Sequence, residues 1–138
     1  MLADAAYLRS LGNLSDDVGE SLLNPHLEAA ADELLSWVGG EAYVDAGQAL
    51  PADPLRARRL RRAEAHLALS KAFTSLSGNF KAGQGFVGGA SQAQGEASFL
   101  TPIQVQELIK QHLALAEREA EAYLPGAVSY VGAVNLDG

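Results

Sequence analysis

Hydrophobic positions recur at helical spacing in four segments of the chain, and this pattern predicts an all-α protein. The first segment, residues 3–11, is short. The second ends at Val38, and its apolar side contains Leu27, Ala31 and Leu34 at a period of 3.6. Two glycines follow Val38, as is common at helix C-termini. We therefore expect two helices in the first 40 residues.

The beginning of the second helix is less regular. Residues 15–17, Ser-Asp-Asp, offer an N-cap for a helix that continues to Val38. Asn24 and Pro25 interrupt it, and they indicate either a fresh start or a kink, because proline removes one helical hydrogen bond. Residues 41–53 are expected to form a connection, with residues 43–44 as its one extended piece.

A third helix is predicted over residues 54–76, with Asp53 as its N-cap and Pro54 at its first position. Its first half is basic, whereas its second half is apolar on all sides. A helix that is apolar all round is buried. We therefore expect this half to be the centre of the core.

The fourth helix has the clearest start. Thr101 is the N-cap, Pro102 takes the first position, and Gln104 completes a capping box. Pro125 and Gly126 end it. Six residues then share one apolar face: Val105, Ile109, His112, Ala116, Ala120 and Tyr123. The opposite face is polar, with Glu107, Lys110, Gln111, Glu117, Arg118 and Glu121.

Two segments lack helical periodicity. Residues 77–98 are rich in Gly, Ser, Ala and Gln, and so long a connection is typical of a lid, an arm or a binding loop. Residues 125–138 contain strand-forming residues with no second strand after them. We predict a small bundle of three to four main helices over residues 1–124, with a flexible loop or hairpin at 77–98, and an extended C-terminal tail.

Charge is segregated along the chain. Half of the ten Lys and Arg residues fall within seven positions, in a protein with 17 Asp and Glu and a net charge of −7. They occupy the first two turns of the third helix, where the helix dipole disfavours positive charge. The cluster is an ordinary solvated face, a nucleic-acid patch or a subunit-interface patch. Its members are Arg56, Arg58, Arg59, Arg61 and Arg62.

No motif predicts catalysis or a bound cofactor. Residues 83–88 match G-x-G-x-x-G, but a helix precedes them where a dinucleotide site needs a strand. His26, His66 and His112 lack metal-ligand spacing, and His112 on an apolar face suits a core or interface histidine. We therefore expect no metal, no cofactor and no enzymatic activity.

The composition suits a soluble intracellular protein. The chain has no cysteine, so it has neither a disulfide framework nor a thiolate metal site. Neither a signal peptide nor an apolar stretch of membrane-spanning length is visible. The acidic body disfavours DNA and anionic membranes as partners, except at the arginine cluster.

Three segments resemble the head–tail connector (adaptor) proteins of tailed bacteriophages: residues 11–40, 62–70 and 100–103. Those proteins have a D-x-x-L-L entry into a first long helix that ends near an aromatic residue and a glycine. Leu22 and Leu23, then Trp37 and Gly39, are similar. They also have an A-E-A-x-L-A-L central helix, a variable loop, a last helix and an extended tail. The Gly/Gln-rich loop at 77–98 departs from the family pattern.

The resemblance implies a structural virion protein in the neck of the particle, assembled in the host cytoplasm. Copies of it, typically twelve, would form a ring beneath the portal protein, and DNA would pass through the lumen without specific binding. The other side of the ring would receive the next connector or a tail-completion protein. The tail would reach the portal by strand addition. The anchoring residues would be Val128, Tyr130, Val131 and Val134.

On this hypothesis the five arginines meet an acidic surface of an adjacent subunit, for which Glu117, Glu119 and Glu121 are the candidates. Separated charges of opposite sign suit a head-to-tail interface, and such interfaces close into rings. The alternative is a small cytosolic helical protein that binds other proteins, or nucleic acid through the arginines.

Overall fold

The computed structural model describes residues 1–76 and 101–125. Within them the secondary-structure elements are helices joined by turns. The predictions for the loop at 77–98 and for the tail, including its four candidate anchors, fall outside these residues. The helices are α1 (Ala5–Gly12), α2 (Glu20–Val38), α3 (Gly40–Ala46), α4 (Pro54–Leu76) and α6 (Pro102–Ala120), followed by the 3-10 turn η2 (Glu121–Tyr123).

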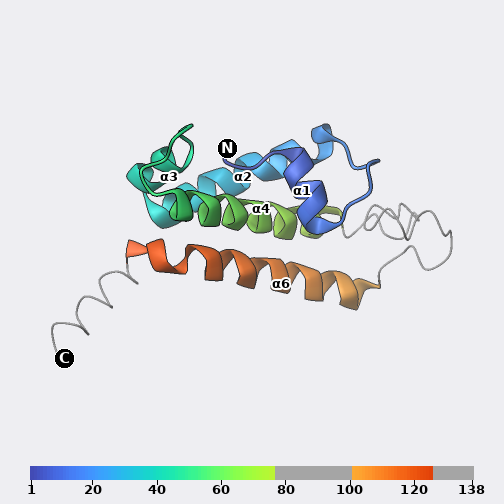
Figure 1. The fold of residues 1–138 in the computed structure, drawn as a ribbon. Helices are drawn as coiled ribbons and strands as arrows, with labels where there is room; N and C mark the ends of the chain where they lie inside the picture. Colours follow the sequence, from blue (N-terminus) through green and yellow to red (C-terminus); the bar gives the residue numbers. More distant parts are fainter. Residues whose placement is uncertain (77–100, 126–138) are drawn as a thin grey trace, which may run out of the picture.

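Helix α4 lies at the centre of the described residues and contacts each of the other four α-helices among them. Helices α1, α2 and α3 cover one side of it, and α6 runs antiparallel to it on the other side (Figure 1). All eight residues from 63 to 70 are buried, as the apolar composition of this half predicts. The largest core side chains are Phe73, Leu8, Leu23, Leu27, Leu34, Leu60, Leu67 and Leu69. Each such side chain contributes about 1.5–3 kcal/mol by burial.

Helix α6 follows the predicted pattern. The Thr101 hydroxyl accepts a hydrogen bond from the Gln104 N–H at 3.1 Å, and the Gln104 side chain accepts one from the Thr101 N–H at 2.8 Å. The capping box is therefore confirmed. The predicted apolar face is buried or half-buried along its whole length, and the six residues of the opposite face are exposed.

Helix α2 begins later than predicted. Residues 15–17 form a turn instead of a cap, in which the Ser15 hydroxyl accepts a hydrogen bond from the Asp17 N–H. The helix starts at Glu20 and passes through Pro25 without a fresh start. Pro25 and Ser21 are exposed, so the carbonyl that loses its partner at Pro25 is on the solvent side.

The predicted connection at 41–53 is wrong in its first half, because Gly40–Ala46 is helix α3. Gly39 ends α2 with φ 89° and also caps α3. The β-propensity of Tyr43 and Val44 is overridden by tertiary contacts, as often happens to propensity. Ala42 is buried, and the Tyr43 hydroxyl donates to the Glu64 carboxylate of α4.

Helix α1 also differs slightly from the prediction, since it begins at Ala5 with Asp4 as its N-cap. Its last residue, Gly12, packs closely on α4. A Cβ atom at Gly12 would lie 2.5 Å from the Leu69 side chain, which is fully buried. Glycine is therefore needed there for the close approach of the two helices.

Candidate functional site

The arginine cluster occupies the first turns of α4, as the sequence predicts. The Asp53 carboxylate accepts a hydrogen bond from the Arg56 N–H at 3.1 Å and caps the helix. The five guanidinium groups then leave the helix in different directions. Four of them have a partner in the same chain, so the cluster is more than a solvated face.

Arg56 and Arg61 connect α4 to neighbouring segments. The Arg56 guanidinium lies 3.1 Å from the Asp45 carboxylate, at the end of α3. Asp45 also accepts hydrogen bonds from the backbone of the following loop, and the bond from Ala52 is the main cause of its lowered pKa. Arg61 lies over the Tyr7 ring of α1, with 4.0 Å between the guanidinium carbon and the ring centre. This is cation–π distance.

Arg59 and Arg62 both pair with Glu119 of α6, at 3.3 and 2.8 Å. The Glu119 side chain is only 12% exposed. The sequence prediction placed the partners of these arginines on an adjacent subunit, whereas Arg59 and Arg62 have this one in their own chain. Arg58 is exposed and has no ion pair or hydrogen bond within the described residues.

We define the arginine face as Leu55, Arg58, Arg59, Arg62 and Glu119. These residues line a shallow cavity of about 360 Å³ between α4 and α6. Leu55 is 54% exposed. Three arginines face one glutamate here, so the arginine face keeps a positive excess.

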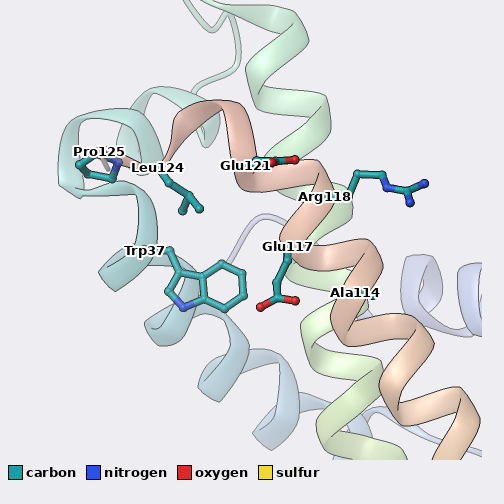
Figure 2. Close-up of a pocket in the computed structure, with 7 residues that line it drawn as sticks. All are labelled: Trp37, Ala114, Glu117, Arg118, Glu121, Leu124 and Pro125. Carbon is teal, nitrogen blue, oxygen red and sulfur yellow. The ribbon is translucent and has the colours of Figure 1, made fainter. Parts of the chain in front are cut away.

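A larger groove lies between the end of α2 and the end of α6. We call it the Trp37 groove. Its volume is about 790 Å³, and it is lined by Trp37, Ala114, Glu117, Arg118, Glu121, Leu124 and Pro125. Figure 2 shows the Trp37 ring and the Leu124 and Glu117 side chains directed into the space between the two elements, whereas Arg118 extends away from Trp37. Trp37 entered the sequence analysis only through the family resemblance.

The three glutamates of the predicted acidic surface are therefore divided. Glu117 and Glu121 are exposed and line the Trp37 groove, whereas Glu119 belongs to the arginine face. An α-helix turns by about 100° per residue, so Glu119 points to nearly the opposite side of α6 from Glu117. The role of these residues in a subunit interface stays a prediction.

Two histidines that no sequence pattern connects are in contact between α4 and α6. The Nδ1 atoms of His66 and His112 are 2.9 Å apart, and Phe73 stacks on His112. Burial lowers the pKa of both rings, and His66 as a neighbour helps to lower that of His112 to about 4. The neutral pair can share one hydrogen bond, with one ring donating and the other accepting. Within the described residues no cluster of three metal-ligating side chains occurs.

Glu64 is a second polar group inside the core that sequence analysis missed. It is fully buried in α4. Its Oε2 accepts hydrogen bonds from the Leu2 and Ala3 N–H groups at 2.6 and 2.7 Å, and its Oε1 accepts one from the Tyr43 hydroxyl. A carboxylate within an all-round apolar half-helix must be buried and therefore paired, and this signal was present in the sequence.

Comparison with protein families, with curated proteins and with solved structures gives no match. Among the described residues no helix is long and apolar enough to cross a membrane. The chemistry of the molecule is therefore argued from its surfaces. Among the described residues, the arginine face and the Trp37 groove combine exposed charge with apolar contact area.

Proposed function

We propose that this chain is a structural virion protein, a head–tail connector that forms a ring beneath the portal of a tailed bacteriophage. DNA passes through the ring without specific binding, and the ring joins the portal to the next connector or tail-completion protein. The proposal rests on the sequence resemblance together with the surfaces of the bundle.

One structural observation supports it most. The last turns of α6 carry an open surface on each of two flanks, the positive arginine face and the Trp37 groove with its two exposed glutamates. A groove lined by apolar side chains and rimmed by charge suits contact with another protein. A protein that works as one copy of an assembly needs such surfaces.

The end of α6 supports an anchoring role for the residues that follow it in sequence. Pro125, the last residue that the structure describes, lies on the wall of the Trp37 groove. On this proposal Val128, Tyr130, Val131 and Val134 add to a strand of the portal.

The structure supports nucleic-acid binding through the arginines less well than the sequence alone does. Arg56 pairs with Asp45, and Arg59 and Arg62 share Glu119. Each acidic partner reduces the positive potential available to phosphates. A duplex would approach a cluster in which Arg58 and Arg61 alone have no acidic partner among the described residues, on a body of net charge −7.

The test is to produce the chain together with the portal protein of the same phage and to image the purified particles by electron microscopy. We expect an additional ring of density on the portal and co-purification of the two proteins. The same preparation is sedimented with and without duplex DNA at low salt, where no shift is expected. A full-length chain that stays off the portal contradicts the proposal, and a shift with DNA favours the alternative.

A further inference from the structure

We infer that the Trp37 groove of one copy receives the arginine face of the next copy, so that the chain associates with itself head to tail. The inference deepens the proposed function, because it names the two surfaces that build the ring. It also makes a statement about self-association that is tested without a portal.

The lining of the Trp37 groove suits an occupant that presents an apolar group and a cation. Trp37 and Leu124 offer apolar contact area, and Glu117 and Glu121 place two carboxylates on its rim. Both glutamates are exposed and form no ion pair within the described residues. An occupant of opposite charge gains from both of them.

The arginine face offers these two groups side by side. Leu55 projects from the first turn of α4 with 54% of its surface exposed, and Arg58 follows one turn later without a partner among the described residues. Residues three apart on a helix are neighbours on its surface. The apolar and the cationic group can therefore enter one groove together.

The two surfaces do not compete with each other. Glu117 and Glu121 lie on one flank of α6, and Glu119, which holds Arg59 and Arg62, lies on the other. One copy can therefore give its arginine face to one neighbour and its groove to another. Such a contact is heterologous, and it generates a closed ring or a filament.

A second copy of the chain suits the Trp37 groove as its occupant because of its charge. Half of the basic residues of the chain lie in residues 56–62, so another copy presents its strongest positive charge there. The groove carries two glutamates and one arginine on its rim. Like-charged surfaces would repel, so two grooves or two arginine faces do not pair, and only the head-to-tail arrangement brings opposite charges together.

The first experiment uses the absence of native cysteine. Two single variants, Leu55→Cys and Ala114→Cys, are mixed in equal amounts and treated with a short bismaleimide. We expect a cross-linked heterodimer in clear excess over either homodimer, because position 55 of one chain meets the groove of the other. Ile103→Cys, exposed near the start of α6 and about 16 Å along the helix from position 114, replaces Ala114→Cys as the matched control. Equal yields with both partners contradict the inference.

Charge reversal then tests complementarity. Arg58→Glu in the first chain, or Glu117→Arg with Glu121→Arg in the second, is expected to lower the cross-linking yield about tenfold. Combining the reversed chains restores opposite charges and is expected to restore the yield. Failure of this rescue, with the circular-dichroism signal of every variant intact, contradicts the pairing.

Trp37 distinguishes the possible occupants, since it is the only tryptophan of the chain. Filling of the groove by a second copy shifts its fluorescence to the blue as concentration rises, and Arg58→Glu abolishes this shift. If the chain's own tail filled the groove, the blue-shifted emission would not depend on concentration and deletion of residues 127–138 would remove it. That result, or an emission that no condition changes, overturns the inference.

The two proposals can fail separately. Head-to-tail cross-linking in a chain that does not join the portal would keep the interface and reject the phage function. Binding to the portal without cross-linking between positions 55 and 114, tested in the portal-bound assembly, would keep the function and reject this interface.

Discussion

Glu64 shows how a single residue connects three parts of the fold. Its carboxylate lies in the middle of α4 and binds the backbone of residues 2–3 with one oxygen and the Tyr43 hydroxyl of α3 with the other. Burial and the bond to Glu64 raise the pKa of Tyr43, so its hydroxyl keeps its proton. A buried carboxylate is tolerated here because every oxygen has a donor.

Replacement of Glu64 by glutamine should therefore be costly although the shape hardly changes. The amide oxygen can replace Oε2 and accept both backbone N–H groups, but these hydrogen bonds lose the charge of their acceptor, and the amide nitrogen then faces the Tyr43 hydroxyl, which must accept instead of donate. We expect a loss of about 2 kcal/mol in the free energy of unfolding, measured by urea denaturation. Tyr43→Phe should cost about 1–2 kcal/mol.

Glu107→Gln, on the exposed face of α6, is the matched control for the loss of one negative charge. It should change stability by less than about 0.5 kcal/mol. If Glu64→Gln were as harmless as this control, Glu64 would not hold the N-terminal segment.

At the scale of elements, the contact of α4 with α6 is unusual in having a histidine pair inside it. His66 and His112 face each other from the two helices, with Phe73 stacked on His112. Glu119 favours the charged form of His66 and Arg62 disfavours it, but burial is the largest cause of its lowered pKa. If both rings were protonated, two N–H groups would face each other at the Nδ1 to Nδ1 distance of 2.9 Å.

This contact should weaken in acid. An unfolded histidine binds its proton near pH 6.5, whereas folded His112 binds one only near pH 4. Between these values the unfolded chain holds more protons, so stability falls as the pH drops through this window. For His112 the loss reaches about 3 kcal/mol at most. Urea denaturation at a series of pH values from 7 to 4 measures it.

The double variant His66→Leu with His112→Phe should remove the part of the pH dependence of stability that the histidine pair causes. Replacing both partners by apolar groups changes stability at pH 7 by about 1 kcal/mol or less. His26→Gln is the control, because His26 is half-buried elsewhere and its pKa is also lowered by burial. An unchanged pH profile in the double variant would show that the histidine pair is not its source.

At the scale of the whole molecule, some charged residues form ion pairs within the chain and others remain exposed to solvent. Arg59 and Arg62 bind α6 through Glu119, whereas Arg58 remains on the surface. Partly exposed pairs of this kind contribute about 1 kcal/mol or less each. On the proposed function, the remaining open surfaces serve assembly rather than folding.

Deletion of residues 127–138 should separate folding from assembly. The core that the described residues form lies within residues 2–124, so the truncated chain should keep its helical circular-dichroism signal and its unfolding midpoint. We expect it to lose co-purification with the portal. Serine at positions 128, 130, 131 and 134 keeps the length of the tail and should have the same effect. A truncated chain that still joins the portal would reject the anchoring role.

The elements that the sequence predicted correctly are those with local causes. The capping box at Thr101 involves residues three apart, and the buried half of α4 follows from its own composition. The start of α2 was predicted too early, because the apparent cap at residues 15–17 forms a turn instead. Helix α3 was missed, because tertiary packing overrides the β-propensity of Tyr43. Local signals are reliable where no distant contact competes with them.

By itself the sequence determined the class of the fold, the central helix, the faces of α6 and the position of the arginines at the start of α4. The tertiary structure decided which charges meet. His66 and His112 are 46 positions apart in sequence, Arg62 and Glu119 are 57 apart, and Leu2 and Glu64 are 62 apart. Such pairs depend on the rotation and register of one packed helix against another, and no periodicity within a single helix contains that information.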